Sequence, residues 1–308
     1  MPIAHRSRRC PAFATARQIV CLTLVAAAGV AHAGESFLGY TRGAETLPAG
    51  AAELYQTLTY RGDKGAGSYR ALDSETEIEY GLTDRLSGAL TLKAQAIDTD
   101  GLLIDAYIPR DERHGLRVSG VEALLQYNFL KPALDPFGLS ATFGFEHSWR
   151  DPHSGQDKDP YSFETGLQTQ KFFRDDQLVW LGNVGIEATI AKRDPIDNLP
   201  AGFEWPTDEE MEIEFTAATG LSYRFAPNWF VGAEVLYQIE RETEVGIERW
   251  SVQAGPSLHY GGRHWWATLT WLPQLTGGGE TFPEQDDTGL HLIEKTKQEA
   301  RLRLGYNF

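Results

Sequence analysis

The chain has 308 residues and a formal net charge of −15, from 28 Lys and Arg against 43 Asp and Glu. This acidic balance excludes a protein that holds nucleic acid on a basic surface. After residue 33, no segment reaches the roughly 18 apolar residues that a membrane helix needs. A membrane protein of this composition must therefore span the bilayer as a closed β-barrel.

The first 33 residues have the three parts of a secretory signal peptide. Arginines 6, 8, 9 and 17 come first, an apolar run at 19–30 follows, and Ala31-His32-Ala33 is a small-x-small cleavage site. We expect residues 1–33 to be removed, because the apolar run is too short for a retained spanning anchor. Both cysteines, Cys10 and Cys21, would be lost with them, which suits an oxidising compartment. The remaining chain would carry 24 basic against 43 acidic residues, a net charge of −19.

Residues 51–308 read as a succession of amphipathic β-strands with period two. The predicted strands are 51–61, 69–82, 86–98, 116–129, 138–149, 161–173, 178–192, 210–225, 228–242, 248–260, 263–275 and 290–308. In the strand at 210–225, for example, Met211, Ile213 and Phe215 share one face, and Glu212 and Glu214 share the other. The connections alternate between short turns and longer polar loops. The sequence therefore predicts an all-β, transmembrane, antiparallel up-and-down barrel of about 12 strands, with short periplasmic turns and longer extracellular loops.

The last strand carries a second signal of location. Ala300, Leu302, Leu304, Tyr306 and Phe308 alternate with polar or small residues, and the chain ends on an aromatic. This resembles the C-terminal signature of bacterial outer-membrane barrels. The resemblance implies an integral outer-membrane protein that the barrel assembly machinery recognises through Phe308, with outer-membrane lipid and lipopolysaccharide as its surroundings.

The polar faces of the strands would line the lumen, and they are rich in carboxylates. The strand at 69–82 places Asp73, Glu75, Glu77 and Glu79 in one row, with neighbours roughly 6.6 Å apart, so a positive charge should balance them. The candidates are Arg301 and Arg303 on the last strand and Arg224 near a short turn. Further carboxylates expected in the lumen are Glu122, Glu146, Glu164, Glu187, Glu212, Glu214, Glu234 and Glu240.

Two interpretations of this acidic lumen remain open. It is either a pore or binding site that attracts a cationic solute, or a structural network of ion pairs and water that fills a narrow barrel. Strand number does not decide, because about eight strands give a filled interior and sixteen or more an aqueous channel.

Catalysis and metal binding are not expected. Outer-membrane phospholipases resemble this chain in class and carry His-x-Ser on one strand, but His147 and Ser148 are adjacent and point to opposite faces. The loop acids Asp151, Asp157, Asp159, Asp286 and Asp287 lack the spacing of an EF-hand. We interpret them as solvated charge, loosely bridged to lipopolysaccharide by divalent ions. No catalytic residue, metal site or cofactor is predicted.

Residues 34–50 precede the first strand and have neither strand nor helix periodicity. This segment is either a periplasmic linker or a partial plug that folds into the lumen. Phe37, Leu38 and Tyr40 would gain from burial there.

Two motifs, FLGYTRGAETLPAGAAELYQ at 37–56 and ETEIEYGLTDRLSG at 75–88, resemble the start of an uncharacterised family of porin-like outer-membrane proteins from Gram-negative bacteria. These motifs carry no assigned functional residues, so no activity transfers with the resemblance. From the predicted barrel and its acidic lumen we expect a passive channel or transporter for small cationic or neutral solutes. The alternative is a structural or surface-interaction protein with a sealed lumen. An open path past the acidic row favours the first, and closure by ion pairs or by the N-terminal segment favours the second.

Overall fold

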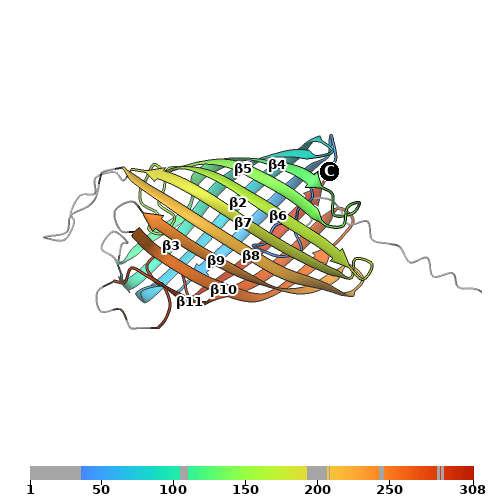
Figure 1. The fold of residues 1–308 in the computed structure, drawn as a ribbon. Coiled ribbons are helices and arrows are strands. Elements are labelled where there is room, and N and C mark those ends of the chain that lie inside the picture. The colour runs from blue at the N-terminus through green and yellow to red at the C-terminus, as the bar shows by residue number, and fades with distance from the viewer. Residues whose placement is uncertain are drawn as a thin grey trace, which may run out of the picture. The chain divides into compact units, whose positions relative to one another are not determined.

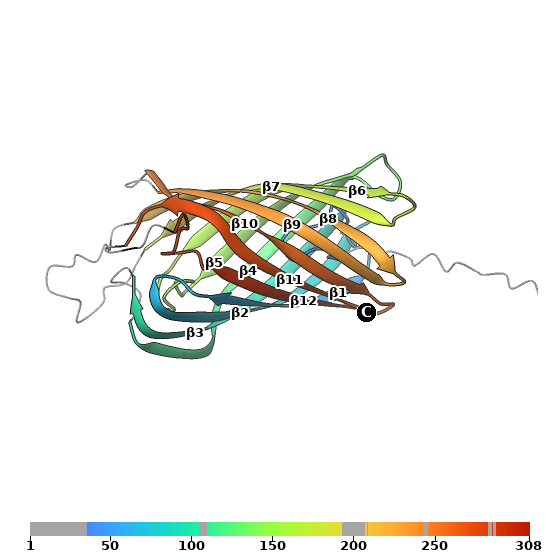
Figure 2. The same ribbon diagram turned by 90° about the horizontal axis from the view of Figure 1, so that it is seen from below.

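The computed structural model describes residues 36–104, 110–192, 207, 209–242, 246–282, 285 and 288–308. Within them, twelve antiparallel strands form one closed barrel in which β1 pairs with both β2 and β12. The strands are β1 (Ala52–Gly62), β2 (Ala66–Thr83), β3 (Leu86–Leu103), β4 (Glu112–Leu130), β5 (Gly138–Ser148), β6 (Tyr161–Phe173), β7 (Leu178–Ala191), β8 (Glu210–Ala226), β9 (Trp229–Glu242), β10 (Gly246–Gly261), β11 (Trp265–Gly279) and β12 (Gln298–Asn307). The predicted fold is confirmed, and Figures 1 and 2 show the strands inclined around the barrel.

The barrel closes at a seam between its two terminal strands. Glu53 near the start of β1 pairs with Asn307 at the end of β12, so both strands meet at the end of the barrel that carries the short turns. The register continues without a break to Gly62 opposite Gln298. Every strand edge is therefore paired, as a bilayer requires of a β structure.

The two faces of the wall differ in polarity as the alternation predicted. On β8, Met211, Ile213 and Phe215 are exposed on the outside. Large apolar side chains are exposed in the same way on all twelve strands, whereas the buried inward positions include many Thr, Ser and Gln. An apolar exterior around a polar interior is the pattern of a barrel surrounded by lipid.

The last strand is shorter than predicted. It begins at Gln298, and the prediction that it starts at residue 290 was wrong. The consecutive side chains of Leu292 and Ile293 are both buried, and both pack with Phe282. A strand would place them on opposite faces. Residues 288–297 instead form an irregular segment that folds inward at the end of the barrel that carries the longer loops.

Candidate functional site

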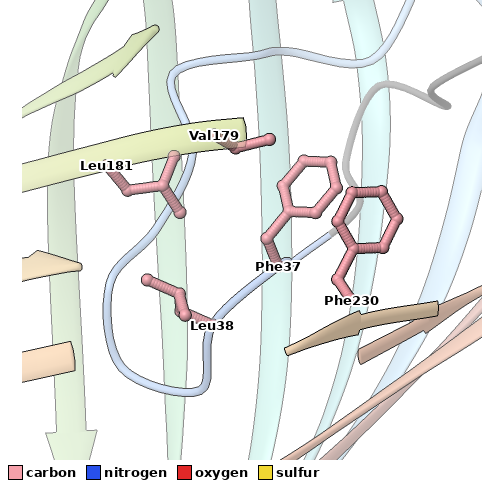
Figure 3. Close-up of a cluster of buried hydrophobic side chains, with 5 residues drawn as sticks. All are labelled: Phe37, Leu38, Val179, Leu181 and Phe230. Carbon is pink, nitrogen blue, oxygen red and sulfur yellow. The ribbon is translucent and has the colours of Figure 1, made fainter. Parts of the chain in front are cut away.

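The N-terminal residues 36–47 lie inside the barrel, in the half nearer the short turns. Phe37 and Leu38 pack against Val179 and Leu181 of β7 and Phe230 of β9. Figure 3 shows these five side chains pointing toward one another, with Phe37 and Leu38 on the N-terminal loop. Of the two placements considered for this segment, the structure shows the lumenal one.

Two inward-facing glycines make room for Leu38. A Cβ on Gly220 of β8 would lie 2.4 Å from Leu38 Cδ1, and one on Gly232 of β9 would lie 2.8 Å from Leu38 Cδ2. Any larger residue at either position would collide with the segment. The lumen wall is thus recessed where the N-terminal segment docks.

The carboxylate of Glu234 holds the innermost turn of the segment. Its Oε1 accepts a hydrogen bond from the N–H of Gly39 at 2.8 Å. Its Oε2 accepts from the N–H groups of Tyr40 and Thr41, at 3.0 and 2.9 Å, and from the Thr41 hydroxyl at 3.0 Å. The side chain of Thr270 donates to Oε1 as well. Glu234 is only 1% exposed, and these donors stabilise its buried charge.

From this turn the segment runs back across the lumen to the wall near β3. Arg42 exchanges two hydrogen bonds with the side-chain amide of Asn183 on β7. Ala44 donates to Gln170 on β6, and Leu47 donates to Ser87 on β3. The segment therefore contacts strands around much of the barrel and narrows this half of the lumen.

A larger space remains between the N-terminal segment and the outer loops. This chamber has a volume of about 510 Å³, and Tyr40 of the segment forms part of its wall. Nine carboxylates and seven Lys or Arg side chains line it. We refer to it below as the central chamber.

Most of the charges in and around the chamber are paired. Arg61 binds Asp73 at 2.6 Å, and Lys93 binds both Glu122, at 2.8 Å, and Glu146. Further ion pairs join Arg249 to Glu214, Glu240 and Glu294, Lys158 to Glu212, and Lys295 to Glu214.

Three chamber carboxylates have no cation bound to them among the described residues. Glu187 accepts a hydrogen bond from Thr189, and Glu299 accepts one from the Tyr40 hydroxyl. Glu75 has neither an ion pair nor a side-chain hydrogen bond in the described part of the chain. The chamber therefore keeps an excess of negative charge after its ion pairs are counted.

The other acids of the predicted row have polar partners of their own. The carboxylate of Glu77 accepts a hydrogen bond from Thr91, at 3.4 Å, and that of Glu79 accepts one from Tyr55, at 2.9 Å. Asp73 has Arg61 as its cation, a residue that the sequence reasoning missed.

The three arginines proposed to balance the row do not form ion pairs with it. Arg301 donates to Thr59 and to the carbonyl of Gly39, and its guanidinium lies 3.8 Å from the centre of the Tyr40 ring. Arg303 lines a small cavity of about 40 Å³ together with Glu77 and Glu79. The expectation for Arg224 was wrong, because it donates to the carbonyl of Asp175 in the turn after β6.

Arg42 of the N-terminal segment is a further cation that the sequence reasoning missed. The carboxylates that act on it most strongly are Glu77, Glu122 and Glu164. It also lines the small cavity beside Arg303. The segment thus brings positive charge to the acidic wall as well as steric bulk.

At the outer end, residues 149–160 and 288–297 fold over the chamber. Pro152, His153 and Lys158 of the first segment and Glu294 and Lys295 of the second line the chamber wall. The carboxylate of Asp151 accepts hydrogen bonds from the N–H groups of residues 153 and 154 and lies 3.9 Å from Lys158. We call these two segments the outer lid.

The loop acids do not form a metal site in the described residues. Asp157 pairs with Arg150, and Asp159 lies 3.5 Å from His147. Asp286 and Asp287 lie outside the described residues. One group of three carboxylates, Glu240, Glu248 and Glu294, has oxygens within 4.8 Å of one another, but Arg249 binds two of the three.

His147 and Ser148 lie on opposite faces of β5, as their spacing requires. The His147 ring stacks on Tyr161 with a centroid distance of 4.4 Å. Ser148 donates to Glu146 inside the barrel, at 2.7 Å. The pair therefore has no geometry for Ser-His chemistry.

Solved structures with the same fold are outer-membrane proteins. An outer-membrane channel from Pseudomonas putida F1 matches with a TM-score of 0.57 and 11% identity, over 86% of this chain and 98% of that one. The β domain of the Bordetella autotransporter BrkA matches with a TM-score of 0.52 and 12% identity, over 84% of this chain and all of that one. A search of curated proteins found no match. In the described residues no helix is long and apolar enough to cross a membrane.

The fold, the apolar exterior and the charged lumen define an outer-membrane β-barrel, porin-like in architecture, with a partly filled interior. Residues 30–308 match the model of a family of unknown function, DUF6662. The chain belongs to that family.

Proposed function

We propose that this barrel is a passive outer-membrane channel for small cationic or neutral solutes. The central chamber carries the proposal, because its volume of about 510 Å³ and its charged lining give small polar solutes a space inside the barrel. One protein of similar fold is itself an outer-membrane channel, which adds support at the level of architecture.

The preference for cations rests on the carboxylates left without a cation. Glu75, Glu187 and Glu299 face a space in which most other charges are neutralised. A ring of uncompensated carboxylates attracts cations and repels anions in a narrow pore.

Planar bilayers containing the purified protein test this directly. The wild-type protein should conduct, and a salt gradient should give a reversal potential of cation selectivity. Changing Glu75, Glu77 and Glu79 together to Gln should reduce that selectivity, with Glu75→Gln alone giving the largest single contribution. Bilayers that stay silent over a wide voltage range would contradict the channel.

The sealed-lumen alternative has an observation in its favour, the N-terminal segment docked across the lumen. A variant that lacks residues 36–47 separates the two. In a channel narrowed by the segment, the deletion should raise single-channel conductance. If wild-type and deletion proteins are both silent while their folding is intact, the barrel is a structural or surface-interaction protein.

The remaining parts of the proposal concern the export of the protein to the outer membrane and the lipids around the barrel. We propose that residues 1–33 are cleaved as a signal peptide, that the assembly machinery recognises Phe308, and that the apolar belt contacts lipid and lipopolysaccharide. Mass spectrometry of the protein from outer membranes would test the mature start at Gly34. No catalytic activity is proposed, and an assay of the purified protein on phospholipid would test that.

A further inference from the structure

Three parts of the chain meet where the outer lid closes over the chamber. The N–H of Gly65, in the turn between β1 and β2, donates to the carbonyl of Leu292 at 3.0 Å. Tyr69 Oη donates to the carbonyl of His153 at 2.9 Å, and Arg61 donates to the carbonyl of Pro152 at 2.7 Å. The lid is thus docked on the β1–β2 turn from two sides.

Three basic side chains are enclosed in this junction, and each has one side-chain nitrogen atom without a hydrogen-bond partner among the described residues. In the part of the chain that the structure describes, these buried atoms are Lys64 Nζ, His153 Nδ1 and His291 Nδ1. Lys64 and His291 are each only 1% exposed. The amine of Lys64 faces the ring of Tyr69, 4.3 Å from its centre.

The imidazole ring of His291 makes one hydrogen bond in the described residues, and that bond requires the neutral ring. Its Nε2 lies 3.3 Å from the N–H of Glu294, which can only donate. A protonated imidazole has no acceptor and would lose this bond. The docked position of segment 288–297 therefore selects the uncharged histidine.

The carboxylates that act on His153 and Lys64 are already engaged by other groups. The cations that face His153 are Lys64, Arg249, Arg61 and Lys295, from the β1–β2 turn, β10, β1 and the other lid segment. Glu294, 4.0 Å from His153, already binds Arg249. For Lys64 the facing groups are Arg61, Asp151, Glu294 and Arg249, and Asp151 is held by Lys158 and by backbone N–H groups.

The pKa values follow from this enclosure. Burial, reinforced by Lys64, holds the pKa of His153 well below its usual range. Burial lowers the pKa of His291 to about 4. Glu294 acts in the opposite direction, and the facing cations Arg249, Lys295 and Lys64 add to the lowering. In an open lid both rings would be hydrated and titrate near 6.5. The open lid then binds more protons, so the closed lid loses stability as pH falls from about 6.5 toward 4.

We propose that the outer lid is an acid-responsive cover, closed near neutral pH and released when His153 and His291 become protonated beneath it. The residues that carry the response come from two loops far apart in sequence, and they share one cation-rich junction. Release would uncover the central chamber on the extracellular side. The inference does not depend on conduction, because a barrel that only binds solutes would be uncovered in the same way.

A single introduced cysteine can report the lid position. Ser154 is buried in the lid, 1% exposed, and S154C is a conservative change. L134C, in an exposed turn at the opposite end, reports intrinsic thiol reactivity at each pH. Both are made in the full chain with Cys10→Ser and Cys21→Ser and labelled with a dithiodipyridine, which reacts with thiols in acid.

The ratio of the S154C rate to the L134C rate should rise about tenfold or more between about pH 7.5 and about pH 4.5. Adding H153Q and H291Q should reduce the rise to less than about threefold. H264Q, in an exposed turn at the other end, should leave it unchanged. Folding of each variant is checked by heat-modifiable gel mobility. If H153Q with H291Q fails to fold, the two single variants replace it, and each should weaken the response.

A ratio that stays constant with pH would overturn the proposal. So would a full rise in the variants that lack the histidines, because the response would then belong to other groups. Neither labelling rate depends on ionic current through the barrel. Bilayers that stay silent would therefore contradict the proposed channel function without affecting this test of the lid.

Discussion

Glu234 and Thr41 are joined by two hydrogen bonds, because one carboxylate oxygen accepts from both the backbone N–H and the hydroxyl of Thr41, at 2.9 and 3.0 Å. Residues 36–48 belong to no strand, so their buried N–H groups need other partners. The carboxylate of Glu234 supplies acceptors for three consecutive N–H groups, from Gly39 to Thr41. A lumen carboxylate that resembles a solute site in the sequence thus serves to fix the chain's own N-terminal segment.

Glu234→Gln should loosen that segment. The amide replaces one acceptor oxygen with a donor that faces other donors, so charge-assisted hydrogen bonds worth about 1.5–3 kcal/mol each are lost. Arg42 should then become accessible to trypsin, and we expect cleavage at Arg42 to be about a hundredfold faster than in wild type. The measurement is limited proteolysis followed by mass spectrometry.

Glu187→Gln is the matched control for that variant. It likewise removes one inward-facing carboxylate, but Glu187 makes no hydrogen bond to the N-terminal segment in the described residues. Its cleavage rate should equal that of wild type. Equal rates for Glu234→Gln and wild type would show that the carboxylate does not hold the segment.

Lys93 joins the carboxylates of Glu122 and Glu146 on neighbouring strands. Lys93→Met should leave both acids without a cation and destabilise the barrel by about 3 kcal/mol, because an unpaired buried charge costs more than the pair contributes. Denaturant unfolding in detergent measures this. Lys171→Met, at the outer surface beside Phe173, should change stability by less than about 1 kcal/mol.

Removing the two acids as well should restore stability. If the loss in Lys93→Met comes from uncompensated carboxylates, then Lys93→Met with Glu122→Gln and Glu146→Gln should recover most of it. A triple variant as unstable as the single one would instead assign the loss to packing of the Lys93 stem.

Lys64→Met should change how the thermal stability of the protein depends on pH between about pH 7 and about pH 10.5. Burial lowers the pKa of Lys64 to about 7, whereas a hydrated lysine titrates near 10.5. The state in which the outer lid is docked on the β1–β2 turn therefore has its full stability above about pH 10.5, and it loses stability as the pH falls to about 7. Methionine cannot take the proton, so the variant should show a smaller drop in thermal midpoint between about pH 10.5 and about pH 7. An identical drop in both proteins would mean that Lys64 is hydrated or paired in solution.

The alternation of residues was sufficient to predict the strands and the faces of the wall, because burial of one face in lipid is a local property of each strand. It could not predict the partners in the lumen. Lys93 is the ladder neighbour of Glu75, yet its long side chain reaches Glu122 and Glu146 on the next two strands. Such pairings depend on side-chain reach across a curved wall, which a one-dimensional pattern does not contain.

The N-terminal segment was harder to place, because it has no periodicity and takes its hydrogen bonds from side chains of distant strands. One signal was present in the sequence. Gly220 and Gly232 lie at inward-facing positions of neighbouring strands, where a missing side chain leaves room for another part of the chain. Paired inward glycines beside a buried carboxylate indicate a docked segment rather than an open pore.

Leu38→Ala tests that recess directly. Leu38 is fully buried against the two glycines, so truncation should weaken docking of the segment by about 3 kcal/mol. Gly220→Ala should act in the same direction, because its new Cβ would lie 2.4 Å from Leu38 Cδ1 and 2.7 Å from the carbonyl oxygen of Ala233. Hydrogen exchange of the peptide at 36–47 measures docking, and each variant should exchange about a hundredfold faster than wild type.

Two controls separate this effect from general loosening of the barrel. Leu134→Ala removes a leucine that is 81% exposed, and Gly115→Ala adds a methyl where no atom lies within 4 Å. Neither should change exchange at 36–47, and strand peptides away from the recess, such as 138–148, should remain protected in all four proteins. Leu38→Ala could instead leave the segment as protected from exchange as in wild type. The hydrogen bonds to Glu234 would then be sufficient to hold the segment, and packing of Leu38 in the recess formed by Gly220 and Gly232 would contribute nothing to its docking.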